Sequence, residues 1–141
     1  MYLREALKYA DFICSVCTGS LLLAAAGLLA GRPATTHWGC YRILEALGAR
    51  YTRKRWVQDG KFITSAGVSA GIDMALHLVS KLTDEVTACS VQLGLEYDPE
   101  QPFGRINWDG VDRNQLLPYF KAMIRENLGD KPDLTSRLSD L

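Results

Sequence analysis

The feature that most constrains the fold of this chain is an abrupt change of pattern within residues 12–29. Residues 12–16 are rich in aromatic and β-branched side chains, and a short run of this kind predicts a buried strand. Residues 18–29 follow at once, are rich in Ala and Leu and are apolar all round, which is typical of a buried helix. The pattern therefore predicts a strand, a sharp turn and a helix, with Cys17 in the turn.

Further strands and helices are expected to alternate along the chain. The hydrophobic pattern predicts helices at 2–10, 41–47, 72–82, about 84–95 and about 113–127, and strands at 34–36, 56–58 and 61–64. Asp59 and Gly60 join the last two strands, and this dipeptide is typical of a tight hairpin. Alternating strands and helices favour an α/β architecture with a mainly parallel sheet, to which the hairpin is a local antiparallel addition.

Composition narrows the class of protein. A length of 141 residues with 48% hydrophobic and 23% charged residues indicates one globular domain, and the zero net charge leaves no basic field for nucleic acid or a membrane surface. The longest apolar run, residues 21–30, is too short to span a bilayer, and the N-terminus lacks the apolar core of a signal peptide. We therefore expect a cytoplasmic protein whose cysteines, Cys14, Cys17, Cys40 and Cys89, are free thiols.

Cys17 is the candidate reactive residue. A tight strand-to-helix turn, called a nucleophile elbow, presents its side chain outward, and the unpaired N–H groups at the start of the helix favour a thiolate there. The N–H groups of Thr18 and Gly19 would also stabilise negative charge on a substrate, and Gly19 would let helix and strand approach closely. The alternative is that Cys17 is a small buried apolar residue, as free cysteines often are, but the turn favours the reactive interpretation.

Cys14 and Cys17 also form a Cys-x-x-Cys pattern, which in other proteins marks a redox dithiol or half of a zinc site. Here Cys14 would lie within the strand, and residues three apart on a strand face opposite sides. Cys40 and Cys89 have no second metal-binding residue at comparable spacing. We therefore expect neither a redox pair nor a metal site.

Four segments together resemble a known family. They are Ser15–Ser20 (SVCTGS), Thr35–Trp38 (TTHW), Thr64–Asp73 (TSAGVSAGID) and Glu96–Pro99 (EYDP). In order and spacing they are similar to the ThiJ/PfpI superfamily, a branch of the class I glutamine-amidotransferase-like fold, and within it to the isocyanide hydratases. The resemblance covers about residues 2–103 and implies a flavodoxin-like three-layer α/β sandwich. It makes 1–141 a single domain, the C-terminal portion of the family domain, with 104–141 as a peripheral extension.

The resemblance also implies roles for particular residues. Cys17 becomes the nucleophile, Thr18 beside it a backbone and hydroxyl donor, and His37 a match to a family histidine near the thiol. His37 follows a predicted strand, where loops often line the site of an open α/β sheet, and a packed, hydrogen-bonded histidine is the open alternative. His77, inside the helix predicted at 72–82, is the weaker candidate.

Asp73 and Trp38 are candidates for supporting roles. Asp73 is expected in the first turn of its helix, where we favour charge complementarity to the helix N-terminus over catalysis. Trp38 would be either a wall of the substrate cavity or ordinary core, and large aromatic residues favour the core.

One departure from the family affects both assembly and activity. The family domain normally begins earlier, with the first strands of the sheet and an Asp or Glu that serves as acid and base, and neither precedes the matching motifs here. The resemblance therefore implies a truncated domain with an open strand edge and exposed apolar helix faces. We expect a second chain to complete it, as a homodimer.

The resemblance implies an enzyme that needs no metal or organic cofactor. The Cys17 thiolate would attack the carbon of an isocyanide to give a thioimidate, which water hydrolyses to an N-substituted formamide. Deglycase- or glyoxalase-like action on aldehydes would use a similar thiol. The alternative is a small-molecule-binding or redox-sensing module, since a reactive thiol is also readily oxidised and some AraC-type transcription regulators share the CTGS and TTHW elements. Neither a nucleic acid nor a membrane is expected as a partner.

Overall fold

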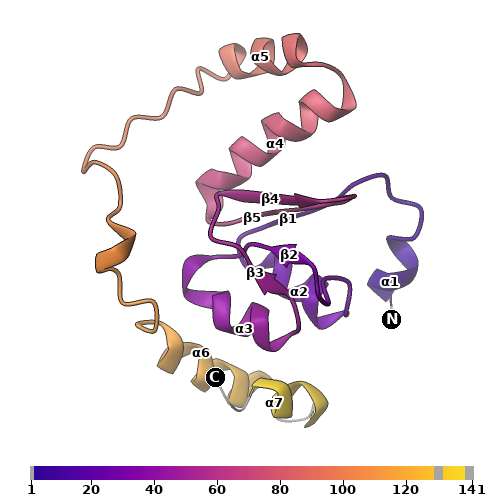
Figure 1. Ribbon diagram of the computed structural model, residues 1–141, viewed down its shortest axis with the longest axis vertical. Coiled ribbons are helices and arrows are strands. Elements are labelled where there is room, and N and C mark those ends of the chain that lie inside the picture. Colours follow the sequence, from indigo (N-terminus) through magenta and orange to yellow (C-terminus); the bar gives the residue numbers. More distant parts are fainter. Residues whose placement is uncertain (1, 129–131, 139–141) are drawn as a thin grey trace.

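The computed structural model of the chain describes residues 2–128 and 132–138 and has an α/β fold (Figure 1). In chain order the elements are α1 (Tyr2–Ala6), β1 (Ile13–Val16), α2 (Gly19–Ala25), β2 (Pro33–Ala34), the 3₁₀ helix η1 (Trp38–Cys40), α3 (Tyr41–Ala46), β3 (Arg50–Tyr51), β4 (Trp56–Asp59), β5 (Phe62–Ser65), α4 (Val68–Leu82), α5 (Glu85–Gly94), the 3₁₀ helix η2 (Trp108–Gly110), α6 (Leu117–Leu128) and α7 (Pro132–Leu138). The predicted α/β class is confirmed.

The main sheet has the strand order β1-β5-β4 and combines both kinds of pairing. β1 runs parallel to β5, with Ile13 opposite Phe62, whereas β4 runs antiparallel to β5. The β4–β5 connection is the predicted hairpin, in which Gly60 takes φ +58°, a left-handed conformation that glycine adopts without strain. β2 and β3 form a second, two-stranded parallel sheet.

Helices lie on both faces of the main sheet and give the molecule its layers (Figure 1). α4 lies along one face, and α2 and α3 lie beyond the other. The core is on the α2 side of the sheet, where Ala24, Leu29 and Leu44 are fully buried. β1 leads straight from this core into α2, which places the turn containing Cys17 at the boundary between sheet and helix.

β1 is buried on one face only. Ile13 and Ser15 are buried, whereas Cys14 and Val16 are exposed. The expectation of a buried strand is therefore wrong for half of its side chains. The cause is the place of β1 at the end of the sheet, where α4 leaves part of the outer face uncovered.

The first two long helices are shorter than predicted. α1 ends at Ala6 rather than at residue 10, and α2 ends at Ala25 because Gly27 turns the chain with φ +74°. Leu22 is 66% exposed, so α2 has an outward face despite its apolar composition. α4, by contrast, begins at Val68 rather than at residue 72, because the small residues before Ile72 form its first turn.

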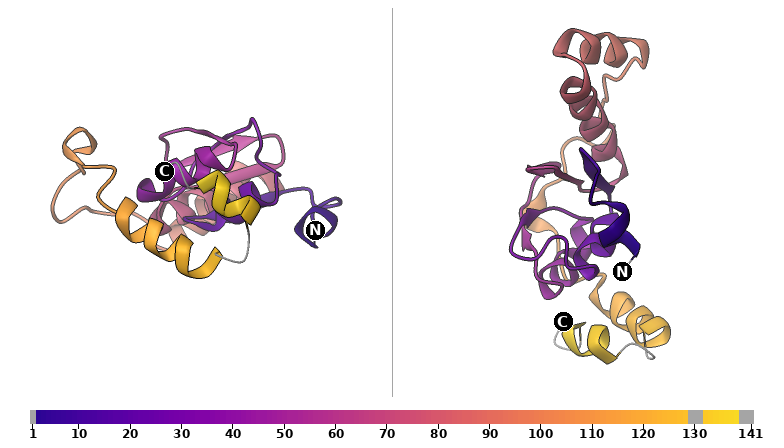
Figure 2. Two further views of the ribbon diagram at one scale, coloured as in Figure 1. Left: turned by 90° about the horizontal axis from the view of Figure 1, so that it is seen from below. Right: turned by 90° about the vertical axis from the view of Figure 1, so that its right-hand side faces the viewer.

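The C-terminal helices contribute to the core, contrary to the expectation that 104–141 is peripheral. Phe120, Ile124 and Leu138 are buried in the main hydrophobic cluster, and Arg137 donates a hydrogen bond to the carbonyl of Leu47 at 2.8 Å. Residues 98–107 are exposed and form an extended arm that leads from α5 back to the body (Figures 1 and 2). The part of the expectation that concerns 129–131 and 139–141 lies outside the described residues.

Within residues 2–128 and 132–138, none of the helices has both the length and the apolar character that a membrane crossing requires.

Candidate active site

Cys17 lies in the turn between β1 and α2 and has a left-handed backbone. Its φ is +56°, a region that residues with a side chain rarely occupy and that proteins often reserve for functional positions. The Cys17 N–H donates to the carbonyl of Ser65 at 3.2 Å, and its carbonyl accepts from the hydroxyls of Ser20 and Thr36 at 3.3 and 3.1 Å. Three hydrogen bonds, to β5, to α2 and to the loop after β2, therefore hold this unusual conformation in place.

Two glycines differ in how closely they bring helix and strand together at this turn. A Cβ built on Gly19 would lie 3.5 Å from Cβ of Ser15, an ordinary contact, so the expected close approach at Gly19 is wrong. A Cβ on Gly71 would instead lie 2.9 Å from Cγ1 of Val16. The close approach is thus made by α4 against the last residue of β1, directly before Cys17, and periodicity alone did not single out Gly71.

Thr18 is the N-cap of α2 but makes no side-chain capping hydrogen bond. Its exposed hydroxyl is therefore not used to satisfy the helix. The N–H groups of Thr18 and Gly19 lie at the start of α2, where a helix leaves N–H groups without internal partners. Their predicted role as donors to a substrate is compatible with this position.

His37 is half-buried at the start of η1 and has a defined tautomer. Its Nδ1 accepts a hydrogen bond from the N–H of Gly39 at 3.3 Å, so the neutral ring carries its proton on Nε2. Burial lowers the pKa of His37, which keeps the ring neutral at pH 7. Among the described residues, the Cys17 thiol and the His37 ring share no hydrogen bond, although Thr36, the neighbour of His37, binds the Cys17 carbonyl.

A cavity of about 370 Å³ lies beside the Cys17 turn. Its walls are Thr36, His37, Trp38, Tyr51, Arg53, Lys54, Arg55, Ala66, Gly67, Ser69, Ala70, Ile106, Trp108 and Arg113. Cys17 does not line it directly, but Thr36 binds the Cys17 carbonyl, and Ala66 follows the residue that accepts the Cys17 N–H. Trp38 is half-buried in this wall, so the preference for Trp38 as a core residue is wrong.

Asp73 belongs to a polar cluster that joins α4 to two other segments. Arg55 and the Tyr97 hydroxyl both donate to its carboxylate, and Tyr97 also reaches the carbonyl of Ser69 at 3.4 Å. Burial opposes ionisation, but the hydrogen bonds from Arg55 and Tyr97 outweigh it and lower the pKa of Asp73. Asp73 lies in the second turn of α4 rather than the first, so these two partners take the place of the expected helix N-terminus.

His77 lies on the same helix but interacts with β4. Its ring stacks on Trp56 with 4.1 Å between ring centroids, and its Nε2 is 2.8 Å from the side-chain oxygen of Gln58. These contacts pack α4 against the hairpin and leave His77 outside the cavity walls.

The four cysteines are free and differ in accessibility. Cys14 and Cys89 are exposed, Cys17 is half-buried and Cys40 is fully buried. Burial, assisted by the nearby charge of Cys17, raises the pKa of Cys40 to about 12. Cys40 therefore remains a thiol at all physiological pH values.

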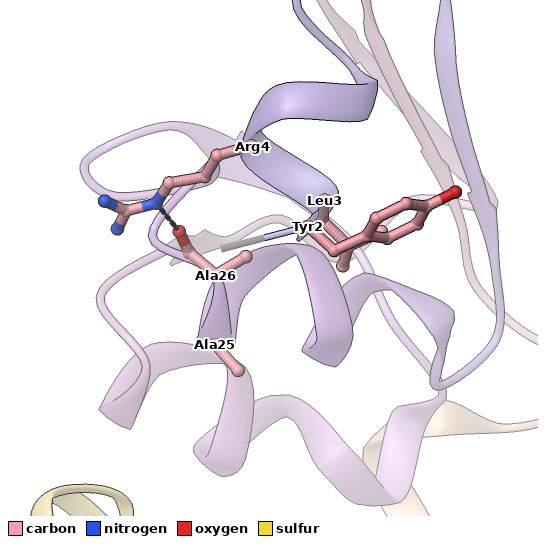
Figure 3. A pocket seen from close by; sticks show the side chains of 5 residues that line it. All are labelled: Tyr2, Leu3, Arg4, Ala25 and Ala26. Carbon is pink, nitrogen blue, oxygen red and sulfur yellow. Dashed lines mark hydrogen bonds between the residues drawn. The ribbon is translucent and has the colours of Figure 1, made fainter.

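A second cavity, of about 380 Å³, lies between α1 and the end of α2 (Figure 3). Its walls are Tyr2, Leu3, Arg4, Ala25 and Ala26, and Arg4 Nε donates to the carbonyl of Ala26. The one charged group there is already hydrogen-bonded, and no cysteine or histidine lines the walls. The cavity beside Cys17 is therefore the better candidate for chemistry.

The fold agrees with what comparison with known proteins shows. The model of the DJ-1/PfpI family matches residues 1–81, more than half of the chain, and the chain belongs to this family. The resemblance inferred from the four motifs is thereby confirmed. Over 102 residues the chain is 49% identical to an isonitrile hydratase from Pseudomonas putida, covering 72% of this chain and 45% of that protein.

Two further relatives mark the range of the family. The HTH-type transcriptional regulator CdhR from Pseudomonas aeruginosa is 38% identical over 94 residues, which cover 63% of this chain and 25% of the regulator. The crystal structure of a ThiJ/PfpI family protein from Pseudomonas syringae matches with a TM-score of 0.67 and 41% identity, over 94% of this chain and 52% of that one. The chain thus spans about half the length of the isonitrile hydratase and of the crystallised protein.

Proposed function

We propose that the protein is a cysteine-dependent enzyme that hydrates an isocyanide to an N-substituted formamide. The observation that carries this proposal is the strained, triply hydrogen-bonded Cys17 turn beside a cavity that can hold a small molecule. The 49% identity to an isonitrile hydratase supports this chemistry over the alternatives. Glyoxalase- or deglycase-like action on aldehydes requires the same thiol and is tested in the same panel of substrates.

The reaction balances without a cofactor. The Cys17 sulfur forms a bond to the terminal carbon of the isocyanide, and that carbon gains the proton that the thiol loses, which gives a thioimidate. Water then adds to the same carbon, the C–S bond breaks, and the products are the formamide and the free thiol. The sum is one isocyanide and one water converted to one formamide.

We assign supporting roles from the geometry of the turn. The N–H groups of Thr18 and Gly19 would donate to the charge that develops as sulfur adds, as in an oxyanion hole. His37, with its proton on Nε2, would relay the proton through a bound water. Asp73 and Trp38 would act indirectly, Asp73 by holding Arg55 in the cavity wall and Trp38 by contact with the substrate body.

The test is turnover of a simple alkyl isocyanide by the unchanged protein and by Cys17→Ala. We expect formamide production, measured by mass spectrometry, to fall at least about 1,000-fold in Cys17→Ala, because the nucleophile is lost. Cys89→Ala, which removes an exposed cysteine far from the turn in sequence, is the matched control and should keep full activity. A thioimidate adduct on Cys17 in the unchanged protein would support the mechanism directly, and turnover that survives Cys17→Ala would contradict it.

The second candidate is a small-molecule-binding or redox-sensing module. The 38% identity to the transcriptional regulator CdhR, together with the cavity, supports it. Under this function Cys17 would be oxidised to a sulfenic or sulfinic acid without turnover of any isocyanide or aldehyde offered. Peptide mapping after treatment with hydrogen peroxide, run beside the turnover assay, separates the two functions.

A further inference from the structure

The cavity beside Cys17 is lined by basic and aromatic side chains, and a simple alkyl isocyanide has no group that would pair with the basic ones. We propose that it selects a substrate with a carboxylate on a small aromatic or branched apolar body, such as an isocyano carboxylic acid. This inference rests on the proposed function and names its substrate class. It follows from the charges, the apolar surface and the size of the cavity.

The charged side chains of the wall are all basic. Arg53, Lys54, Arg55 and Arg113 line the cavity, and its described walls contain no acidic side chain. The first three are consecutive in the segment between β3 and β4, whereas Arg113 lies in the segment before α6. Two separate stretches of chain therefore bring positive charge to one small volume.

Only part of this charge is neutralised within the molecule. Arg55 is paired with Asp73, and Arg53 lies 3.7 Å from Asp109, whose side chain is 90% exposed and gives a weak pair. In the described part of the chain, Lys54 and Arg113 form no salt bridge. The cavity thus keeps a positive charge that an anion could neutralise.

Tyr51 is half-buried in the cavity wall, and the nearby charged side chains affect the pKa of its phenol. Burial raises the pKa of the Tyr51 phenol, while the charges of Arg113 and Arg53 lower it, and Glu45 and Tyr41 raise it further. Glu45 is exposed on α3 and is the acidic group that acts on this wall from outside the cavity. Arg113, Arg53 and Tyr51 all line the cavity, so both positive charges lie near this part of its wall.

The remaining wall is apolar and aromatic. Trp38, Ile106 and Trp108 supply flat and branched surfaces, and Tyr51 adds a fourth. A volume of about 370 Å³ is at the small end of ligand sites and fits one ring with a short polar substituent. A carboxylate on such a body would meet Lys54 and Arg113 while its ring contacts the tryptophans.

The experiment compares pairs of compounds that differ only in charge. N-formylphenylalanine and its neutral amide are unreactive formamides, and their binding is measured by calorimetry. We expect the carboxylate to bind at least about five-fold more tightly than the amide, and the ratio to shrink as salt is raised. Arg113→Gln and Lys54→Gln should each reduce the ratio, and Arg113→Lys should keep most of it. Arg105→Gln, on the exposed arm of residues 98–107 and outside the cavity wall, is the matched control and should leave the ratio unchanged.

A turnover arm separates this inference from the proposed function. The paired isocyanides are 2-isocyano-3-phenylpropanoate and its amide. Charge-selective binding of the formamides without turnover of either isocyanide would sustain the inference about the cavity and overturn the proposed reaction. Turnover of both isocyanides at equal kcat/KM, with equal binding of the two formamides, would sustain the reaction and overturn the inference. Absence of both binding and turnover would overturn both.

Discussion

Cys17, the proposed nucleophile, has a strained backbone conformation. A left-handed backbone costs a residue with a side chain roughly 1–2 kcal/mol, and Cys17 keeps it because Ser65, Ser20 and Thr36 hold both of its backbone polar groups. Glycine would adopt the same conformation without strain. Stability alone therefore does not account for a cysteine at this position, and the proposed chemistry does.

Replacing Cys17 should reveal this cost. We expect Cys17→Gly to be more stable than Cys17→Ala by about 1 kcal/mol, because both lose the thiol but only alanine is strained at φ +56°. Thermal unfolding of the two variants measures the difference. Equal stability, or a more stable alanine variant, would show that the turn relaxes and that the strain is not held in solution.

The two glycines near this turn should respond in opposite ways to the same substitution. Gly19→Ala should be neutral or stabilising by up to about 1 kcal/mol, because a methyl group fits there and alanine favours a helix. Gly71→Ala should destabilise by about 1–3 kcal/mol, because its Cβ would lie 2.9 Å from Val16. Denaturant unfolding of both variants tests this, and a tolerated Gly71→Ala would mean that α4 moves freely over β1.

The four cysteines should differ in their reactivity because they differ in accessibility. Iodoacetamide should modify Cys14, Cys17 and Cys89 in the folded protein, because all three reach solvent, and should spare Cys40, which is buried with a raised pKa. The sequence predicted a buried strand around Cys14, but the Cys14 side chain is exposed. Peptide mapping after timed labelling provides the measurement. Rapid labelling of Cys40 would contradict the packing of η1 and α3.

At the scale of elements, hydrogen bonds among Arg55, Asp73 and Tyr97 connect the start of α4 to the segments before β4 and after α5. Arg55 precedes β4, Asp73 lies in α4 and Tyr97 follows α5. α5 itself buries no side chain, so this cluster and Gln92, which donates to the Tyr97 carbonyl at 3.2 Å, fix where the exposed arm begins. The cluster thereby also positions Arg55 in the cavity wall.

Removing the Asp73 carboxylate should destabilise the protein in a pH-dependent way. The pKa of Asp73 is lower in the folded state than its ordinary value of 3.8, so its contribution is present above pH 3.8 and is lost as pH falls through the lowered pKa. We expect Asp73→Asn to cost about 1 kcal/mol at pH 7 and progressively less below pH 3.8. Urea unfolding at several pH values measures this.

The matched control for that series is Asp98→Asn, which alters an exposed carboxylate one residue from Tyr97. It should change stability by a few tenths of a kcal/mol or less at every pH. A pH-independent loss in Asp73→Asn, or an equal loss in both variants, would contradict the assigned hydrogen bonds.

The sequence predicted the elements more accurately than their ends and contacts. The strand–turn–helix at Cys17 and the Asp59-Gly60 hairpin follow from local chemistry and are present. The early end of α1 depends on Lys61, and the cavity wall depends on Trp108, and both are contacts made across the whole chain. Hydrophobic periodicity carries no information about such contacts, which is why the contacts of Tyr97 and Gly71 were not predicted although both residues lie within the family motifs.

Two exposed surfaces of the described residues bear on how the molecule assembles: the outer edge of β1 and one face of α5. Ile13 and Cys17 donate their N–H groups toward β5, at 2.7 and 3.2 Å, so the alternation of the strand turns the backbone groups of Cys14 and Val16 to the other edge. No described strand pairs with that edge. On α5, Val86 and Leu93 are 77% and 79% exposed and lie on one face of the helix.

These surfaces predict self-association, because an open strand edge and an uncovered apolar helix face both favour contact with a second copy. We expect sedimentation velocity to show a concentration-dependent dimer. Val86→Lys with Leu93→Lys should shift it toward monomer. Asp98→Asn with Glu100→Gln raises the net charge by the same two units at exposed residues outside α5 and is the control for net charge. A monomer at every concentration, or equal effects of both pairs, would contradict the α5 contact.

Lys61, in the hairpin turn, connects to the start of the chain. Its Nζ lies 3.0, 3.3 and 3.4 Å from the carbonyls of Leu7, Lys8 and Ala10 and takes the place of further helical hydrogen bonds after α1. During synthesis on the ribosome, Leu7 emerges well before Lys61, which follows it by 54 residues. The carbonyls of Leu7, Lys8 and Ala10 therefore gain these hydrogen bonds only after the hairpin has been translated, and we expect the segment between α1 and β1 to settle late in folding.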